Sequence, residues 1–488
     1  MDGAATTISG AISTTANALR DAFVEGRFSD ITVDVKNTKF RLHRVVLWQI
    51  PYFRSLFQGN WKDSDQDLLR LDAADPLVTA EAFQAVVRTV YHLPMALTLQ
   101  NVLSIHAAGS FLQMEELCVK CVDFISDHLS VDNVVSFTLI ADAYEYMARK
   151  RLAEACKRFL LVHATDLRDQ LSKLTVASLR DLFASDSLWV PSEYDRFTLI
   201  MDAFAPKLEA AGKKSRAKAA PGVAGGDQWG PDGAWRWASL PHAQILSAGY
   251  DDFPRESEDS VRRALESILA TSLHFEYLSL EDGRAACARC AELKMCGAME
   301  ALLVGRFKAE ALQATIQSQG AAAAVRAPAQ GEDPPQPFDK DLGTFRFGVE
   351  LADAKGLRPD GYWASGRVFF GGSEWWLVVQ RRQRKNYTGH PYGVFLYRES
   401  ADTERRLYSD RRSQLAVEVE FLCAGRRHPD KRRKFRNWDY CADWGFWQFL
   451  VEDELDMYLT AKDSLRFGVL VRLAFGSSPS GAGYAQDG

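Results

Sequence analysis

The chain has 488 residues, of which 47% are hydrophobic and 25% charged, and its formal net charge is -5 at pH 7. This balance is typical of a soluble globular protein, and the length predicts about two to four domains. The small negative charge excludes an overall attraction to nucleic acid or to an anionic membrane surface.

Residues 1–20 have neither the basic start nor the apolar core of a targeting signal, and no apolar run is long enough to span a bilayer. The eight cysteines are spread too widely for a disulfide framework, so we expect reduced thiols. These features predict an intracellular protein, cytoplasmic, nuclear or both. Because small polar residues bury little surface, residues 1–20 are predicted to be a disordered tail.

A strand pair followed by a helix pair is predicted over residues 28–57. Apolar and polar residues alternate from Ile31 to Val35, which is the period of a strand with one buried face, and the alternation resumes after a turn at Asn37-Thr38. Beyond His43 the apolar spacing becomes helical, and Pro51 suits the first turn of a helix. The stretch is therefore predicted to nucleate a small domain.

The same stretch resembles the start of a BTB (POZ) domain. The resemblance rests on Phe28-Ser29-Asp30, on Phe40-Arg41-Leu42-His43-Arg44 with Leu47, and on Pro51-Tyr52-Phe53-Arg54-Ser55-Leu56-Phe57. It implies a homodimer, with Asp30 as a buried, paired carboxylate near the dimer interface. We expect His43 to be structural, with its ring bonding nearby backbone at a helix start, rather than a ligand or a catalytic residue.

The predicted α/β BTB domain extends over residues 21–130. Leu69 and Leu71 indicate a further strand, and apolar residues recur at helical spacing beyond it. Helices are predicted over 83–90, 101–111 and 114–129.

Residues 131–318 are predicted to form an all-α domain. The run Leu188-Trp189-Val190-Pro191-Ser192-Glu193-Tyr194-Asp195-Arg196-Phe197 resembles a BACK domain, and Leu273 to Leu278 resembles an element of a second BACK repeat. Residues 211–233 are rich in Gly, Ala, Pro and Lys and predict a flexible insertion. Helices are predicted over 133–147, 152–163, 176–183, 261–269 and 285–296.

Two CxxC pairs, Cys118 with Cys121 and Cys287 with Cys290, offer the thiolates that a zinc site uses. The pairs are far apart in sequence, and each lies within an apolar stripe at helical spacing. We therefore interpret them as small buried hydrophobic residues. No metal and no cofactor is predicted.

A second linker, residues 319–337, precedes an all-β domain over residues 338–475, and residues 476–488 are predicted to be a disordered tail. The prolines of the linker stop any helix that its alanines favour. Many short alternating segments separated by turns favour a sandwich. Strands are predicted over 345–351, 368–370, 372–379, 393–397, 415–421 and 465–473.

The tetrapeptide Asp443-Trp444-Gly445-Phe446 and the apolar residues after it resemble the signature of MATH (TRAF-like) domains. In adaptors that carry this domain, the resemblance implies that Asp443, Trp444 and Phe446 help to line a groove for an extended substrate peptide. The alternative is that the two aromatic residues belong only to the core of the sandwich, because residues at i and i+2 share a face.

Two basic segments, residues 381–385 and 426–436, are predicted to be loops inserted in the sandwich. For the run from Arg426 to Lys434, a solvated loop is the commonest role. A nuclear-import signal, pairing with acidic substrate segments and a nucleic-acid contact are the alternatives, although no nucleic-acid recognition motif accompanies them.

The chain lacks a phosphate-binding glycine loop, a nucleophile elbow and a paired His-Glu metal motif, so we predict a protein-binding function rather than an enzyme. The resemblances imply a substrate adaptor of a cullin-RING ubiquitin ligase, dimeric through BTB, bound to cullin through BTB and BACK, and bound to substrate through MATH. The alternative is a BTB scaffold or transcriptional co-regulator that recruits no ligase.

Trp61 and Asp63 are the predicted cullin-contacting residues. Adaptors of this family usually carry a hydrophobic residue, any residue and then glutamate after the second helix, and Trp61-Lys62-Asp63 occupies that place. Aspartate keeps the charge but is shorter by one methylene, so weakened binding is expected. Alternatively, Trp61 only covers a loop of the BTB surface.

Overall fold

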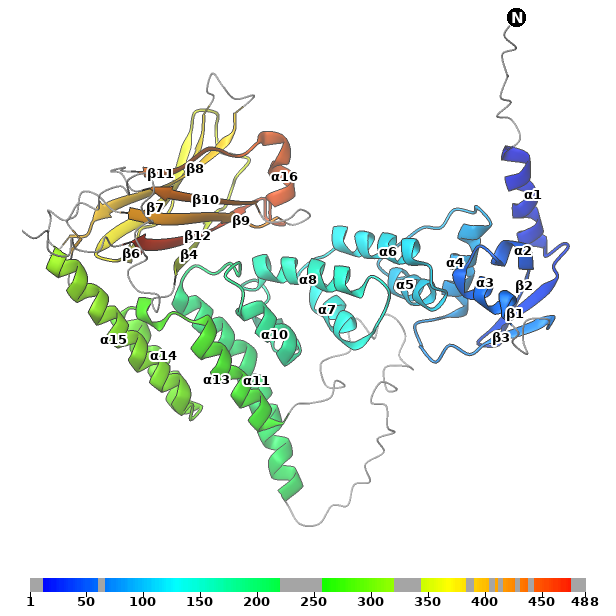
Figure 1. The fold of residues 1–488 in the computed structure, drawn as a ribbon, viewed down its shortest axis with the longest axis horizontal. Helices are drawn as coiled ribbons and strands as arrows, with labels where there is room; N and C mark the ends of the chain where they lie inside the picture. The colour runs from blue at the N-terminus through cyan, green and yellow to red at the C-terminus, as the bar shows by residue number, and fades with distance from the viewer. Residues whose placement is uncertain are drawn as a thin grey trace, which may run out of the picture. The chain divides into compact units, whose positions relative to one another are not determined.

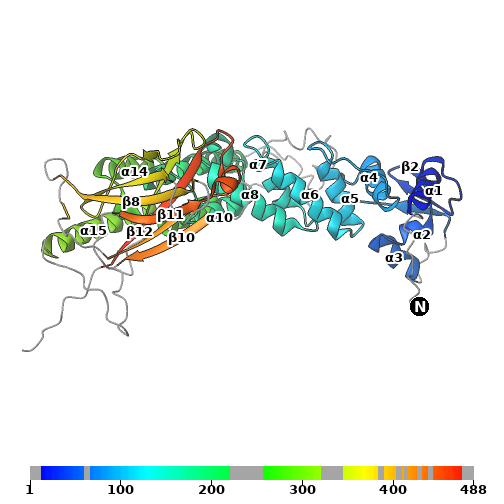
Figure 2. The same ribbon diagram turned by 90° about the horizontal axis from the view of Figure 1, so that it is seen from above.

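The computed structural model describes residues 12–59, 66–219, 257–319, 344–382, 390–402, 409–410, 416–425, 431–437 and 443–474. These residues divide between two compact units, one ending at Lys157 and the other beginning at Arg158 (Figures 1 and 2). The division falls inside helix α8 (Arg149–His163). No helix within the described ranges is long and apolar enough to cross a membrane.

The first unit contains a small sheet with strand order β2-β1-β3. Strand β1 (Ile31–Val35) pairs with β2 (Thr38–Leu42) in antiparallel fashion and with β3 (Leu68–Leu71) in parallel fashion. The predicted hairpin is confirmed, although its turn lies at Lys36 and Asn37, one residue earlier than expected. Both turn residues have positive φ, which matches the twist of a two-residue hairpin.

Two helices of the first unit, α3 and α4, begin at residues that favour a helix start. Pro51 is in the first turn of α3, and the Thr79 hydroxyl accepts a hydrogen bond from the Ala82 amide at the start of α4. Helix α1 (Ile12–Glu25) begins earlier than predicted: residues 12–20, expected in the disordered tail, are helical, and residues 1–11 lie outside the described ranges. The other helices are α2 (Arg44–Leu47), α3 (Pro51–Gln58), α4 (Ala80–Val90), α5 (Val102–Phe111), α6 (Glu115–Asp127) and α7 (Val134–Ala143).

The second unit begins with helices, as the apolar periodicity predicts. Ser192 caps α11 by accepting a hydrogen bond from the Asp195 amide at 3.1 Å. Residues 211–219 of the predicted insertion are part of α11, and residues 220–233 lie outside the described ranges. The helices are the end of α8, α9 (Arg168–Leu171), α10 (Val176–Phe183), α11 (Glu193–Ala219), α13 (Glu258–Ser272), the 3-10 turn η3 (Phe275–Tyr277), α14 (Leu280–Glu292) and α15 (Cys296–Gln319).

Two sheets follow in the same unit and enclose one apolar core. One sheet has the order β10-β9-β12-β4, and the other has the order β11-β8-β7-β5, with β6 also paired to β7. Alternate residues of facing strands fill the core between the sheets, which is the packing expected of a sandwich. The strands are β4 (Phe345–Leu351), β5 (Tyr362–Ala364), β6 (Val368–Phe370), β7 (Ser373–Arg381), β8 (Tyr392–Ser400), β9 (Ala416–Cys423), β10 (Lys431–Asn437), β11 (Asp443–Leu450) and β12 (Leu465–Ala474).

Within the second unit, helices α10, α11, α13, α14 and α15 lie on one side of the sandwich (Figure 1). The Trp189 indole N–H lies 3.4 Å from the carbonyl of Val349 and 3.2 Å from that of Phe467, which belong to neighbouring strands. The Gly348 amide donates to the Pro191 carbonyl at 3.2 Å. The segment 188–197, which the sequence predicts as the most recognisable part of the helical domain, therefore also contacts strands β4 and β12 of the sandwich.

Two arginines complete this packing. Arg346 contacts Asp186 and Glu193, and its guanidinium also donates to the Ser272 carbonyl. Arg466 donates to both carboxylate oxygens of Asp166 and lies over the Trp189 ring, with 4.3 Å between the guanidinium carbon and the ring centre. Because both arginines are buried, each needs the charge and carbonyl partners that the helices supply.

Candidate protein-interaction sites

His43 is buried and fixed by hydrogen bonds at both ring nitrogens. Nε2 lies 2.7 Å from the Arg27 carbonyl, and Nδ1 lies 2.8 Å from the Tyr91 hydroxyl, which also accepts from the His43 amide. The carbonyl can only accept, so Nε2 carries a proton, and in the neutral ring Nδ1 accepts from the Tyr91 hydroxyl. This geometry agrees with the structural role that the sequence predicts for His43.

Asp30 is exposed in the single chain, so its burial near a dimer interface stays a prediction. Its Oδ1 accepts a hydrogen bond from the Arg44 amide at 2.7 Å, at the first position of α2. A carboxylate at a helix N-terminus satisfies an unpaired amide there. Asp30 therefore fixes the segment before β1 against the start of α2.

Four large apolar side chains are exposed in this part of the first unit. They lie at the end of α1, in the loop after it, and on or just after α2. His43 and Asp30 hold that loop against α2 through their contacts with Arg27 and Arg44. The four residues are Val24, Phe28, Val45 and Trp48, with exposed fractions of 69%, 90%, 78% and 41%.

The predicted cullin residues Trp61 and Asp63 lie outside the described residues. Phe57, before this stretch, and Gln66, after it, both contact Arg44. The guanidinium carbon of Arg44 lies 5.1 Å from the centre of the Phe57 ring, and its Nη2 donates to the Gln66 carbonyl at 2.6 Å.

The predicted substrate tetrapeptide begins β11, which is an edge strand. Asp443, Trp444 and Phe446 pair with Tyr397, Leu396 and Val394 of β8, and the side chains of Asp443 and Trp444 lie outside the described ones.

Phe446 is half-buried against the core of the sandwich. Its ring centre lies 6.1 Å from that of Phe421 and 5.3 Å from the Arg433 guanidinium carbon. At Gly445, an added Cβ would lie 2.1 Å from the Val394 carbonyl oxygen, so only glycine permits this strand pairing. Phe446 thus serves the core while remaining partly accessible at the sheet edge.

The basic segment 426–436 is not simply a loop. Residues 431–437 form β10, and residues 426–430 lie outside the described ranges. Cationic side chains of β10 pair with carboxylates of the adjacent strand: Arg432 with Glu420, and Lys434 with Glu418. Cross-strand pairing of opposite charges explains how so basic a sequence forms a strand. In the other basic segment, Arg381 pairs with Glu452, and residues 383–385 are outside the described ranges.

Cys118, Cys121 and Cys290 are buried, as the helical spacing predicts, whereas Cys287 is only half-buried. Burial raises the pKa of Cys118 and Cys121 to about 12 and that of Cys290 to about 11, which keeps the thiols protonated at neutral pH. Among the described residues, no group of three or more His, Cys, Asp and Glu side chains is placed to hold a metal ion.

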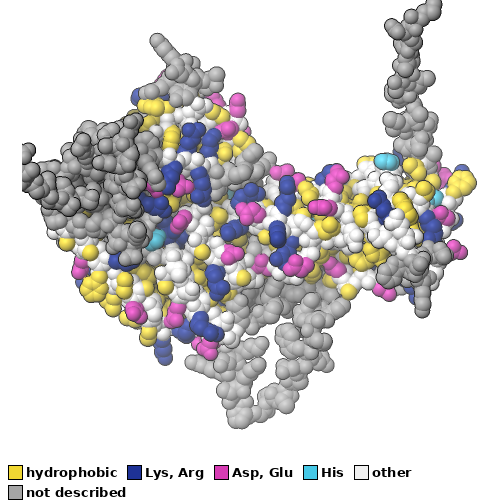
Figure 3. Space-filling model, in the orientation of Figure 1, with side chains coloured by type: hydrophobic (Ala, Val, Ile, Leu, Met, Phe, Trp, Pro, Cys, Tyr) yellow, Lys and Arg dark blue, Asp and Glu magenta, His cyan; other side chains and the backbone are white. Residues whose placement is uncertain are grey.

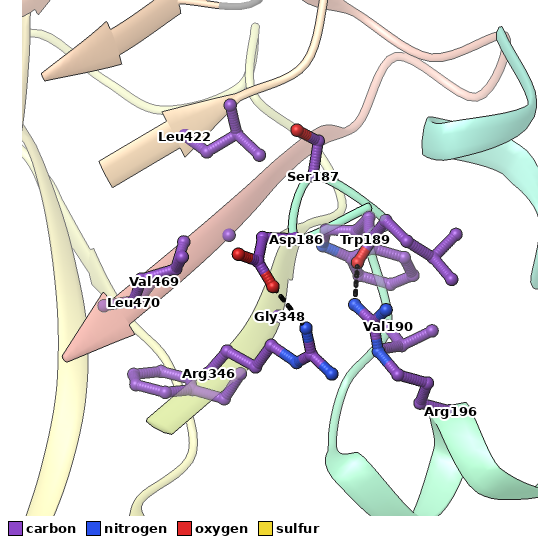
Figure 4. Close-up of a pocket in the computed structure, with 13 residues that line it drawn as sticks. Asp186, Ser187, Trp189, Val190, Arg196, Arg346, Gly348, Leu422, Val469 and Leu470 are labelled. Atoms are coloured by element: carbon purple, nitrogen blue, oxygen red, sulfur yellow. Dashed lines mark hydrogen bonds and ion pairs between the residues drawn. The ribbon is translucent and has the colours of Figure 1, made fainter. Parts of the chain in front are cut away.

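A small pocket of about 20 Å³ lies where the helices pack against the sandwich, close to Asp186, Trp189 and Arg346 (Figure 4). This volume accommodates about one water molecule. Figure 4 also shows Arg196 beneath Trp189; its guanidinium donates to the carbonyls of Phe183, Ser185 and Leu188 at 3.1 Å each. The charged groups here stabilise the packing, and the cavity is too small for an organic ligand.

A larger cleft of about 460 Å³ lies in the same unit, and the sequence did not predict it. Five separate segments line it: residues 191–193, residues 276–280 with Asp282, the middle of α15, residues 345–347 of β4, and residues 368–371 of β6 and the turn after it. Because these segments lie far apart in the sequence, no local motif predicts that they come together.

Over the described surface visible in Figure 3, Lys and Arg side chains are interspersed with Asp and Glu.

Comparison with known proteins identifies the first part of the chain. Residues 19–129 match the family model of the BTB/POZ domain. The chain is 26% identical over 190 residues to Germ cell-less protein-like 1 of Mus musculus, covering 38% of this chain and 36% of that protein.

Other relatives include Protein germ cell-less of Drosophila melanogaster, with 23% identity over 191 residues, covering 39% of this chain and 34% of that protein. Kelch-like protein 17 of Homo sapiens is 28% identical over 191 residues, covering 37% of this chain and 29% of that protein. The matched region thus spans about a third of the length of these relatives. The N-terminal part of this chain, residues 19–129, is a BTB/POZ domain.

Proposed function

We propose that this protein is a non-enzymatic substrate-recognition adaptor of a cullin-RING ubiquitin ligase, acting in the cytoplasm, the nucleus or both. The observation that carries the proposal is a BTB/POZ domain followed in one chain by a second unit in which helices support a β sandwich. One part of such a chain can bind a scaffold while another holds a substrate protein.

The BTB/POZ domain dimerises through the apolar side chains at the end of α1 and around α2. Val24, Phe28, Val45 and Trp48 expose apolar surface to solvent in the single chain. Exposed apolar groups that gather in one region mark an interaction surface, because burying them against a partner removes them from water. A second copy of the domain supplies that partner, and Asp30 is then covered at the same interface.

The cullin scaffold binds the stretch that contains Trp61 and Asp63, and the helices that follow the BTB/POZ domain, residues 133–183, extend the contact. Phe57 and Gln66, on either side of this stretch, both contact Arg44, so the two described ends of the chain here lie close to the same side chain. Trp61 enters an apolar pocket of the partner, and Asp63 supplies the adjacent negative charge.

Substrates bind as extended segments to the sandwich, which we interpret as a MATH-like domain, at Asp443, Trp444 and Phe446. Support comes from the place of β11 at a sheet edge and from the partial exposure of Phe446. Edge strands offer backbone groups to an added strand, while partly exposed aromatic rings hold its side chains.

Binding of the purified full-length protein to the N-terminal part of the cullin scaffold tests the ligase assignment. We expect Trp61→Ala to weaken the affinity, since it removes the apolar contact, and Asp63→Glu to strengthen it, since the longer side chain restores the usual reach. Tyr362→Ala, an exposed residue of the second unit, serves as the control and leaves the affinity unchanged. If the wild type shows no binding at tens of micromolar, the ligase assignment is wrong.

The second candidate function is a BTB-based scaffold or transcriptional co-regulator without ligase recruitment. The shorter aspartate at residue 63 favours it, because it stands where adaptors usually carry glutamate. In that case partner proteins still bind the sandwich and the dimer still forms. Absence of cullin binding together with retained dimerisation distinguishes this function from the first.

A further inference from the structure

The cleft of about 460 Å³ in the second unit has the size of a ligand site and opens beside the edge of a sheet. On one side lies β4, which is the last strand of its sheet among the described residues. On the other lies β6, which pairs with β7. Phe345 to Phe347 and Val368 to Phe370 line the cleft from these two strands.

The open part of the β4 edge is confined to the cleft. Further along the strand, the Gly348 amide donates to the Pro191 carbonyl, so that position is already occupied. In an antiparallel strand, residues two apart direct their N–H and C=O groups to the same side. Arg346 therefore directs its backbone groups away from β12 as Gly348 does, and Arg346 lines the cleft.

Aromatic rings form the apolar base of the cleft. The Phe345 and Phe370 rings stack with their centres 4.2 Å apart, and Tyr277 meets both edge-on at 5.4 and 5.3 Å. Leu312 of α15 is buried beside them in the sandwich core and also lines the cleft. Such a surface holds an apolar side chain of a bound segment.

The charged side chains of the cleft favour a cationic ligand. Three carboxylates line it, those of Glu193, Glu276 and Asp282, against the guanidinium groups of Arg306 and Arg346. Both guanidinium groups already contact carboxylates: Arg346 pairs with Glu193 and Asp186, and Arg306 pairs with Glu310, 3.2 Å away. With Asp186 and Glu310 included, five carboxylates surround two guanidinium groups in and beside the cleft, so the excess of negative charge favours a cation over an anion there.

We propose that this cleft binds an extended segment of a partner protein that combines an apolar anchor side chain with a lysine or arginine. The segment adds to the edge of β4 at Arg346, its anchor lies on the aromatic base, and its cation faces the carboxylates. This site is separate from the proposed groove at β11, because β11 is at the other edge of the sheet that holds β6. An experiment that disproves the groove at β11 therefore leaves the proposal for this cleft untouched.

Selection of random displayed peptides on the full-length protein tests the proposal. We expect enriched sequences that carry a lysine or arginine near an aromatic or aliphatic residue. Ala309→Trp fills the cleft from α15 and abolishes their binding, whereas Ala314→Trp, an exposed position of the same helix outside the cleft, leaves it intact.

Two N-methylated versions of a selected peptide test strand addition, since each blocks amides on one side of an extended chain. We expect one alternating pattern to weaken binding about tenfold through lost backbone hydrogen bonds and the other to have little effect. Replacing the cation of the peptide by glutamate weakens binding as well.

Three results would overturn the proposal. The first is that no selected peptide distinguishes wild type from Ala309→Trp, and the second is that the enriched peptides are acidic. The third is that a synthetic peptide of residues 320–343 competes with the selected peptides. Those residues follow α15 and precede β4, so the last result would assign the cleft to the chain's own segment and not to a partner.

Discussion

Buried polar side chains determine the local geometry of the BTB/POZ domain. Tyr91 is fully buried, and its hydroxyl both donates to and accepts from His43. Burial raises the pKa of Tyr91 to about 12, so the hydroxyl remains protonated at neutral pH and able to donate. The ring of Phe23 from α1 lies 4.8 Å from that of Tyr91, so the same residue also positions the first helix.

We predict that Tyr91→Phe lowers the free energy of unfolding of the first unit by about 1–3 kcal/mol. The substitution keeps the ring but leaves the buried His43 amide and ring nitrogen without their partner. Denaturant unfolding of the full chain, followed by hydrogen exchange in β1 and β2, measures this loss. Tyr362→Phe, at an exposed position, should change stability by less than about 0.5 kcal/mol, and an equal effect of both variants would contradict the role of Tyr91.

His106 makes the stability of the first unit depend on pH. Its Nε2 lies 2.8 Å from the Met147 carbonyl, whereas Nδ1 is buried without a hydrogen-bond partner. Burial lowers the pKa of His106 below its ordinary value of 6.5. As the pH falls through 6.5, the unfolded chain takes up a proton that the folded chain resists, so stability decreases with decreasing pH in that range.

We expect unfolding of the first unit to become easier between pH 7.5 and pH 5.5, and His106→Gln to flatten this dependence. Hydrogen exchange within α5 at several pH values gives the measurement. His92→Asn, at an exposed position, should leave the dependence as in the wild type. An unchanged slope in His106→Gln would remove His106 as its cause.

At the scale of elements, the packing of strand β4 against the helical segment depends on Gly348. A Cβ added at Gly348 would lie 2.5 Å from the Val190 carbonyl oxygen, and neither backbone can move without disturbing Trp189 or β12. The close approach permits the hydrogen bond from Gly348 to Pro191. Strand β4 is thus held on one side by its sheet and on the other by the helical segment.

We predict that Gly348→Ala destabilises the second unit by about 1–3 kcal/mol, the usual effect of overpacking a close contact. Calorimetry of the full chain should show the transition of this unit at lower temperature, with the transition of the BTB/POZ domain unchanged. Gly366→Ala is the matched control, because nothing lies within 4 Å of a Cβ there. If both variants unfold alike, the approach of β4 to Val190 is not limiting.

At the scale of the whole molecule, the proposed dimer determines how many substrate sites one assembly carries. We expect the full chain to sediment as a dimer at micromolar concentration, and Phe28→Asp combined with Val45→Asp to produce monomers. Both side chains are more than three-quarters exposed, so the substitutions should not unfold the single chain. Tyr362→Asp, in the second unit, should remain dimeric; a monomeric wild type would disprove the dimer.

The sequence by itself determined the elements whose pattern is local. The hairpin from Ile31 to Leu42 follows from alternation, and the helices from apolar residues at a spacing of three and four. The BTB/POZ domain was predictable because its motif lies within thirty residues of continuous chain. Strand β10 was missed because its charges suggested a loop, and only the carboxylates of β9 explain why those charges are tolerated in a sheet.

Only the tertiary structure decided which distant segments meet. The contacts of Trp189 with Val349 and Phe467, and of Arg466 with Asp166, join residues more than 150 positions apart and depend on the folded geometry of both partners. The cleft has the same origin, because the helices and the strands β4 and β6 that line it come together only in the folded structure. Periodicity reports which face of an element is buried, but not which surface will bury it.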